Sequence, residues 1–426
     1  MRIRLIFLLS FFSVQAYAQD STLLFSTGIL VSGSSEQTPF WVAARQHGAV
    51  PSSGSFALGQ FALRKIYQPN DPRIFQWSAS AELIASYSKK ANFFLTDAYL
   101  AGKLGPVELL AGQQKSFTGL VMDTTLTSGS LAMSGNARPF PKIQLSIPEF
   151  YALAFTNNYV SLKASYSDGM LQGSGIAYGS TRLVKQTYLH QKAFYLKFGD
   201  NQNRLHIYTG FNHQVVWGGE KLLDPLHNLS PGKAYWHTIT AKKLDYRIIG
   251  NHFGTIDLGG SWRQPLWTFG VYRQNIFDNG SLFKIINYTD GLNGISAKRN
   301  RRPSRKETYF SLNSAVLEVV GTKSQFNANP ASGLGIFEHG NYFNHYIYQN
   351  GWSYRGYNMG TPLSPSKGST NENLPESASE FTNNNRFWAI HTGLTASWLS
   401  MNFTFKGTHS LNYGTYISDF GHVKHQ

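Results

Sequence analysis

The sequence predicts an all-β protein, a large antiparallel transmembrane β-barrel of about 16–18 strands. Three observations support this fold class. Only 14% of the 426 residues are charged, while 15% are aromatic and 40 residues are glycine. No apolar run reaches the roughly 18 residues that a transmembrane helix requires. Alternation of apolar and polar residues with a period of two, which is typical of barrel strands, recurs through the chain.

The N-terminus has the features of a secretory signal peptide. Arg2 and Arg4 precede a short apolar segment over residues 5–12, and Ala16-Tyr17-Ala18 is a small-x-small cleavage site. The apolar segment is too short to remain as a membrane helix. We therefore predict a signal peptide over residues 1–18 and a single outer-membrane barrel domain over residues 19–426.

Strands are expected wherever the alternation is clear, and the best example runs from Trp388 to Trp398. Leu394 lies on the apolar face of this segment and Thr395 on the other, so we expect Leu394 to face lipid and Thr395 the lumen. The complete set of expected strands is 21–31, 56–67, 73–87, 92–101, 106–114, 142–147, 159–168, 186–198, 204–216, 252–259, 264–274, 282–288, 308–320, 346–357, 386–398 and 400–409. Long loops are expected over 115–141, 217–250, 289–307, 321–345 and 358–385.

Several motifs carry a resemblance to a known family. They are Gly135-Asn136-Ala137-Arg138-Pro139-Phe140-Pro141-Lys142-Ile143, Ile147-Pro148-Glu149-Phe150, Phe155-Thr156-Asn157, Tyr188-Leu189-His190-Gln191-Lys192, Gly210-Phe211-Asn212-His213 with Trp217-Gly218-Gly219, Asn341-Tyr342-Phe343-Asn344, and Gly351-Trp352-Ser353-Tyr354-Arg355-Gly356-Tyr357-Asn358-Met359-Gly360-Thr361-Pro362. Their ordered combination resembles the Wzi capsule-assembly family of outer-membrane barrels, in the form found in Bacteroidetes, and the matches span nearly the whole mature chain.

The resemblance implies an 18-stranded antiparallel barrel that holds or organises capsular polysaccharide at the cell surface without catalysis. Two features depart from the family. Strand-like sequence begins at Leu23, where proteobacterial members have a periplasmic helical bundle. The chain ends on His422-Val423-Lys424-His425-Gln426 rather than on an amphipathic strand with a terminal aromatic residue. Because an open barrel would leave unpaired backbone in lipid, we expect closing C-terminal strands to be absent from this sequence.

Nothing in the sequence indicates catalysis or a cofactor. Cysteine is absent, which excludes disulfides, thiol chemistry and a lipid-anchored N-terminal cysteine. Nucleophile-elbow, dinucleotide-binding, phosphate-loop and zinc-protease motifs are also absent. The 13 histidines are scattered, so no metal site is predicted. The protein is therefore predicted not to be an enzyme.

A basic segment, residues 298–306, is the first candidate binding site. It holds six positive charges in nine residues, among them Arg299, Arg301 and Arg302. The planar guanidinium suits carboxylates of an acidic polysaccharide or phosphates of lipopolysaccharide. A solvated loop without a ligand is an equally good interpretation. Nucleic acid is excluded as a partner because the protein is exported.

An aromatic cluster is the second candidate. Trp352, Tyr354 and Arg355 can stack on sugar rings and hydrogen-bond to hydroxyls, although membrane girdles and barrel packing also use such residues. A third group lies in the Gly/Ser-rich loop 115–141, which can fold into the lumen. There Asn136 and Arg138 are expected to have a structural role, with Arg138 paired to a carboxylate on the wall such as Glu149 or Glu82.

Together these features predict a non-enzymatic outer-membrane protein that binds and organises capsular or other surface polysaccharide. Its expected partners are the polysaccharide, outer-membrane lipid with lipopolysaccharide, and the polysaccharide export machinery. A passive porin is the alternative, with a membrane-embedded hydrolase a more distant one. Lumen occlusion distinguishes the first two, because a barrel plugged by residues 115–141 conducts poorly.

Overall fold

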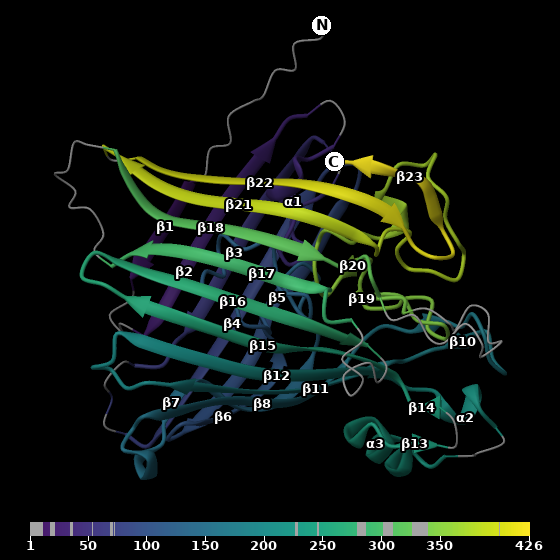
Figure 1. Ribbon diagram of the computed structural model, residues 1–426, viewed down its shortest axis with the longest axis horizontal. Coiled ribbons are helices and arrows are strands. Elements are labelled where there is room, and N and C mark those ends of the chain that lie inside the picture. Colours follow the sequence, from purple (N-terminus) through teal and green to yellow (C-terminus); the bar gives the residue numbers. More distant parts are fainter. Residues whose placement is uncertain are drawn as a thin grey trace, which may run out of the picture.

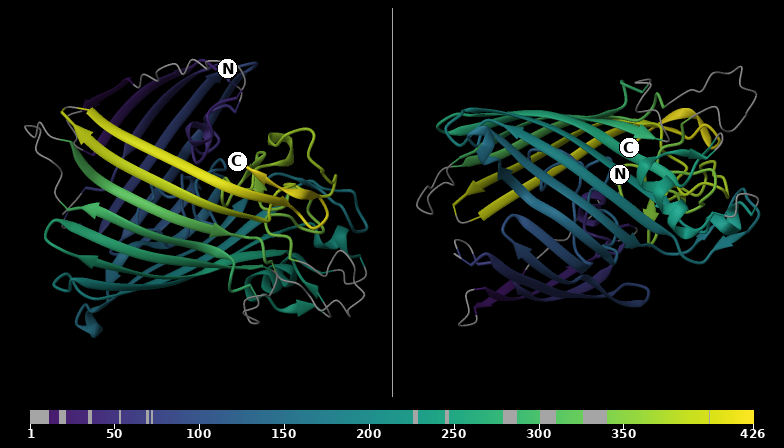
Figure 2. Two further views of the ribbon diagram at one scale, coloured as in Figure 1. Left: turned by 45° about the horizontal axis from the view of Figure 1, so that its top comes forward. Right: turned by 90° about the horizontal axis from the view of Figure 1, so that it is seen from below.

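The structure is a computed structural model that describes residues 12–17, 22–34, 37–52, 54–68, 71, 73–225, 229–244, 247–278, 287–300, 310–325, 340–399 and 401–426. Within these residues 17 strands form one antiparallel sheet that curls into a barrel (Figures 1 and 2). The predicted fold class is confirmed. The described residues contain no helix long and apolar enough to cross a membrane.

The wall strands follow one another along the chain, each paired with the next. They are β1 (Phe12–Tyr17), β2 (Leu23–Ser32), β3 (Phe56–Lys65), β4 (Phe75–Tyr87), β5 (Ala91–Leu104), β6 (Val107–Gln113), β7 (Lys142–Ala152), β8 (Val160–Met170), β11 (Tyr188–Phe198), β12 (Leu205–Trp217), β15 (Asn251–Arg263), β16 (Trp267–Asp278), β17 (Gly291–Arg299), β18 (Ser311–Gly321), β21 (Phe387–Trp398), β22 (Met401–Gly414) and β23 (Asp419–His425).

Smaller elements lie in the connections. They are the helices α1 (Phe40–Ala43), α2 (Glu220–Leu223) and α3 (Pro231–Thr240), the 3-10 helices over Ala154–Thr156 and Lys367–Ser369, and three two-stranded hairpins. The hairpins pair β9 (Ser174–Gly175) with β10 (Leu183–Val184), β13 (Lys243–Leu244) with β14 (Arg247–Ile248), and β19 (Ser353–Tyr354) with β20 (Tyr357–Asn358).

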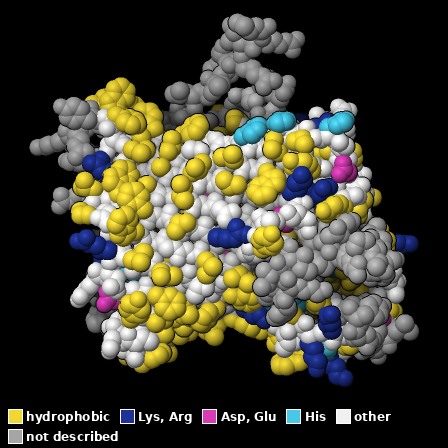
Figure 3. Space-filling model, in the orientation of Figure 1, with side chains coloured by type: hydrophobic (Ala, Val, Ile, Leu, Met, Phe, Trp, Pro, Cys, Tyr) yellow, Lys and Arg dark blue, Asp and Glu magenta, His cyan; other side chains and the backbone are white. Residues whose placement is uncertain are grey.

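The alternation along β21 divides the wall into a lipid face and a lumen face as predicted. Ile390 and Trp398 are 54% and 48% exposed, whereas His391 is fully buried and binds the Leu126 carbonyl inside the barrel. Leu394 shares the face of Ile390, and Thr395 that of His391. Hydrophobic side chains cover much of the strand wall in Figure 3. So large an exposed apolar surface is what a membrane-embedded wall requires.

The connections at the two rims differ in length. At one rim the strands are joined by residues 33–55, 114–141, 171–187, 218–250 and 322–386, and at the other by short segments such as 105–106, 264–266 and 399–400. We call these the long-loop rim and the short-turn rim. In outer-membrane barrels long loops face outward and short turns face the periplasm, so the long-loop rim is the cell-surface side.

One predicted strand was wrong, and a second lies mostly outside the described residues. Residues 346–357 do not form a wall strand, because β18 pairs directly with β21 and this segment lies in the connection between them. Its aromatic residues Tyr348 and Trp352 are buried inside the barrel, so their spacing reflects a packed core. Residues 291–299, which were expected in a loop, form β17. Of the predicted strand 282–288, residues 282–286 lie outside the described residues, and 287–288 form a turn.

The sheet has two ends among the described residues. β1 pairs with β2, and β23 pairs with only the long-loop end of β22, through Leu411, Asn412 and Gly414. No pairing in the described parts of the chain joins β22 or β23 to β1 or β2.

Candidate polysaccharide-binding site on a plugged barrel

The loop 115–141 lies inside the barrel and is bonded to several wall strands. Its backbone amides donate to buried side chains: Leu120 to Asp257 on β15 (2.9 Å), Leu131 to Gln274 on β16 (3.0 Å) and Ser128 to Glu318 on β18 (2.6 Å). Inward-facing polar residues on the wall thus satisfy backbone groups that would otherwise be buried without partners. The segment therefore folds into the lumen, as its composition allowed.

A second loop, residues 340–386, packs on the first from the β18–β21 connection. The Trp352 indole donates to the Ala132 carbonyl (3.0 Å), and the Ser134 amide donates to the Met359 carbonyl (3.0 Å). Trp352 is fully buried in the largest hydrophobic cluster of the described residues, together with Tyr342 and Tyr348. We call the two loops together the plug. Sugar stacking on Trp352 would require this core to open.

Arg45, which the sequence analysis did not single out, ties a third connection to the plug. It follows α1 and donates to the carbonyls of Thr127 (2.6 Å), Thr124 (2.5 Å) and Ser134 (3.1 Å). Burial lowers the pKa of this guanidinium to about 10, although the charge of Glu318 opposes that shift. Only the folded plug brings these carbonyls together, so no local sequence signal marks the residue.

Asn136 lies between the two plug loops and the segment after α1. Its amide group donates to the Asn358 carbonyl (3.1 Å), and its carbonyl oxygen accepts from the Arg45 amide (3.1 Å). It therefore links both plug loops to the segment that follows α1.

The predicted ion pair of Arg138 was wrong. Glu149 is exposed near the short-turn end of β7, whereas Arg138 precedes the opposite end of that strand. Glu82 is bound to Arg64 and Lys115 instead. Within the described residues Arg138 has no carboxylate partner, and its buried Nε has no hydrogen-bond acceptor. A guanidinium whose buried Nε lacks an acceptor is suited to bind an anion.

Arg138 belongs to a group of aromatic and arginine side chains at the long-loop rim. Its guanidinium lies 3.6 Å from the centroid of the Phe94 ring. Arg355, at the turn between β19 and β20, lies over the Tyr354 ring at 5.6 Å. Its amide donates to Gln172, just beyond β8 (2.9 Å). The rim cluster therefore consists of Phe94, Arg138, Tyr354, Arg355 and Tyr357.

Gly48 sets the close approach within this cluster. A Cβ atom at this position would lie 3.0 Å from Cγ of Arg138 and 3.2 Å from the Tyr357 ring, and the residue has φ +61°. Glycine is thus needed both for space and for the backbone conformation. It allows Arg138 and Tyr357 to pack side by side.

The electrostatics of the rim cluster favour an anion. Burial lowers the pKa of Arg138, and the nearby charge of Arg355 contributes in the same direction. Arg355 is exposed, Arg138 and Tyr357 are partly exposed, and Tyr354 is 7% exposed. Two cations without a carboxylate between them attract a negatively charged ligand.

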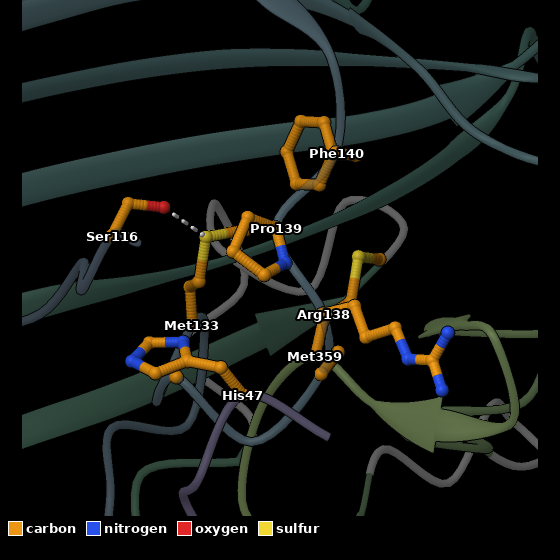
Figure 4. Close-up of a pocket in the computed structure, with 9 residues that line it drawn as sticks. His47, Ser116, Met133, Arg138, Pro139, Phe140 and Met359 are labelled. Carbon is orange, nitrogen blue, oxygen red and sulfur yellow. Dashed lines mark hydrogen bonds between the residues drawn. The ribbon is translucent and has the colours of Figure 1, made fainter. Parts of the chain in front are cut away.

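A pocket adjoins the cluster between the plug and the segment after α1. It is small, and its lining includes His47, Met133, Arg138 and Phe140. In Figure 4 the Arg138 guanidinium points away from the His47 ring, and Ser116 contacts the Met133 sulfur. Burial lowers the pKa of His47 to about 4, with a further contribution from the charge of Lys115. His47 is therefore neutral at physiological pH.

The basic segment is not part of this site. Arg299 ends β17 at the short-turn rim, where it bonds to Ser311 at the start of β18. Arg301 and Arg302 lie outside the described residues. The structure brings Tyr354 and Arg355 together with Arg138, and places Arg299 at the opposite rim.

In the described parts of the chain, no group of three or more His, Asp or Glu side chains is arranged to hold a metal ion.

The fold and the belt of exposed apolar residues define an outer-membrane barrel with a plugged lumen and a cationic, aromatic cluster on its long-loop side.

The family model for capsule assembly protein Wzi matches residues 45–369. The chain therefore belongs to the Wzi family.

A solved structure from Escherichia coli is similar in fold. The Wzi structure from Escherichia coli, described as a carbohydrate-binding β-barrel involved in group 1 capsule assembly, aligns with TM-score 0.53 and 13% identity over 91% of this chain and 70% of that one. The Pseudomonas aeruginosa protein OccD3 aligns with TM-score 0.37 and 10% identity, over 88% of this chain and 85% of that one. OprD from the same species aligns with TM-score 0.36 and 9% identity, over 95% of this chain and 88% of that one. No curated protein matches the chain.

Proposed function

We propose that this protein binds an acidic surface polysaccharide, such as a capsular polysaccharide, at the outer face of the outer membrane, and organises it there without catalysis. The observation that carries the proposal is the rim cluster, in which two arginines without carboxylate partners among the described residues lie beside aromatic rings on the cell-surface side. The family membership of the chain and the carbohydrate binding of the Escherichia coli protein support it.

The chemistry of the cluster fits such a ligand. A guanidinium can bind the carboxylate of a uronic acid, or a phosphate, through two parallel hydrogen bonds. The exposed face of Tyr357 can pack against the apolar C–H face of a sugar ring. Because Arg355 is exposed and Arg138 partly buried, the outer arginine would capture an anionic group and the inner one would position it.

The plug favours this function over a porin. Residues 126–132 are all fully buried or nearly so, and side chains of the wall hold them through direct hydrogen bonds. A solute path would need these bonds to break. A hydrolase has less support still, since the described residues form no metal-holding group and neither the family nor the rim cluster points to hydrolysis.

Other predicted features remain part of the proposal. Residues 1–18 would be removed as a signal peptide, and β1 (Phe12–Tyr17) with them, so the mature chain would begin near Gln19. Arg299 would face the periplasm, where it could meet export machinery rather than the cell-surface polysaccharide. Contact with lipopolysaccharide would occur at the long-loop rim.

A glycan array of acidic and neutral polysaccharides, probed with the detergent-purified full-length protein, tests the binding. We expect acidic glycans to bind, and Arg355→Gln to weaken binding by about tenfold or more, because a hydrogen bond to a charged group contributes about 1.5–3 kcal/mol. Binding should also fall with salt as the Debye length shrinks from about 10 Å at 0.1 M to about 3 Å at 1 M.

Arg182→Gln is the matched control, because Arg182 is an exposed arginine in another loop of the same rim. An equal loss with Arg182→Gln, or no loss with Arg355→Gln, would show that the rim cluster is not the site.

A further inference from the structure

We propose that α3 is an interfacial helix on the outer wall of the barrel, and that Lys233, Lys242 and Lys243 bind anionic lipid headgroups of the outer leaflet around Trp236. These four residues are called the α3 surface. The inference requires only that the barrel lies in the outer membrane, and it does not depend on polysaccharide binding.

The contacts of β11 place α3 on the lipid side of the wall. Gln191 and Tyr195 face the lumen, where they contact Met133 of the plug and Asp257. Alternation therefore turns Lys192 and Phe194 outward, and Phe194 is 47% exposed. The Lys192 ammonium donates to the Ile239 carbonyl in the last turn of α3, and this carbonyl lies at the negative end of the helix dipole.

A second contact fixes the other side of the helix. The Tyr235 hydroxyl donates to the Asp168 carboxylate (2.7 Å) and lies 2.6 Å from the Tyr166 hydroxyl. Tyr166 and Asp168 share the outer face of β8. The helix therefore lies across β8 and β11 outside the barrel, and Figure 1 shows it beside these strands at the lower right.

The wall changes character beneath the helix. Toward the short-turn rim the outward side chains are apolar, as Ile207 and Leu258 show with 53% and 56% exposure. Toward the long-loop rim polar residues join this face: Asp168, His190, Lys192, His213 and His252 share it through strand pairing, with Val215 between His190 and His252. Because the apolar band of a barrel ends at the membrane interface, α3 lies at the level of the lipid headgroups.

The helix is amphipathic in the sense that this location requires. Ala234 and Thr238 are buried against the wall, while Lys233 and Trp236 lie on the opposite face, with Trp236 57% exposed. Exposed Lys242 and Lys243 follow its C-terminus, and residues 229–244 contain no acidic residue. Lysine and tryptophan together are the residues that interface helices use, lysine for phosphate and tryptophan for the boundary of the acyl chains.

Quenching of Trp236 by brominated lipids tests the proposal with the full-length protein. The protein is reconstituted in vesicles that contain either brominated phosphatidylcholine or its mixture with brominated phosphatidylglycerol, and the Trp236 signal is the difference from Trp236→Phe. We expect a preference for the anionic lipid of up to about fivefold per lysine, because each lysine near an anionic surface contributes about 1 kcal/mol. In the K233Q/K242Q/K243Q variant this preference should disappear.

The control variant R182Q/K185Q/K221Q removes the same charge from exposed residues of the long-loop rim outside the α3 surface. It should keep the preference. The gel mobility of unheated samples verifies that each variant is folded. Absence of Trp236 quenching in both vesicles would place α3 away from lipid and overturn the proposal, as would an unchanged preference in the α3 variant or an equal loss in the control.

Discussion

Replacing Glu318 with alanine should release the plug. The Glu318 carboxylate is fully buried and accepts hydrogen bonds from Thr127 Oγ1 (2.5 Å), Tyr272 OH (2.6 Å) and the Ser128 amide (2.6 Å). Hydrogen bonds to a charged group contribute about 1.5–3 kcal/mol each, and loss of one buried charged partner costs about 3–5 kcal/mol in total after relaxation. Because its charge also offsets the burial of Arg45, we expect the free energy of unfolding to fall by about that amount.

Single-channel conductance in planar bilayers is the more specific assay. The wild-type protein should conduct little, and Glu318→Ala should conduct more, because the plug segment around Thr127 loses its attachment to β18. Glu372→Ala, at an exposed acidic residue in the other plug loop, should change neither conductance nor stability. Either of two results would refute the reasoning: a large conductance of the wild-type protein, or a Glu318→Ala variant with the same conductance and the same stability as the wild-type protein.

Three further predictions concern the wall, the pH dependence and the basic segment. Leu394→Arg should cost about 2–4 kcal/mol of stability at the lipid face, whereas Thr395→Arg should cost much less; equal shifts in the unfolding midpoint would contradict the assigned faces. Burial lowers the folded-state pKa of His47 from 6.5 to about 4. The contribution of His47 to the free energy of unfolding is therefore complete above pH 6.5 and is lost as the pH falls toward 4. Tryptophan fluorescence against pH should show a weaker acid dependence in His47→Gln, and an identical profile would argue against this role. The R299Q/R301Q/R302Q variant should retain surface polysaccharide, measured on intact cells, because Arg299 lies at the short-turn rim.

The wall could be predicted from sequence because its determinants are local. Along β21, lipid requires apolar side chains on one face while the lumen accepts His391 and Thr395, so the alternation of the sequence gives the two faces directly. The same logic failed at residues 346–357. Tyr348 and Trp352 are buried in the plug, and the sequence alone does not distinguish a buried core aromatic from one at a membrane interface.

The candidate site depends on contacts between distant segments, which explains why it was predicted only in part. The Tyr354–Arg355 turn was identified, but its neighbours Phe94 and Arg138 come from other connections and strands. Arg138 was expected to pair with a carboxylate on the wall, because a buried guanidinium normally requires one. Glu149 lies too far along β7 and Glu82 is already bound to Arg64 and Lys115. An arginine left without a carboxylate partner could therefore be recognised only in three dimensions.

The plug also determines how the rim can be used. In an open barrel, cations at the mouth would select solutes that pass through the lumen. Here the backbone of residues 126–132 is held inside the wall, and Arg45 joins it to the segment after α1. With the path closed, Arg138 and Arg355 sit on a fixed platform rather than along a channel. A long polymer can then be held at the surface through repeated weak contacts, each of which is fixed in position by a wall that does not need to move.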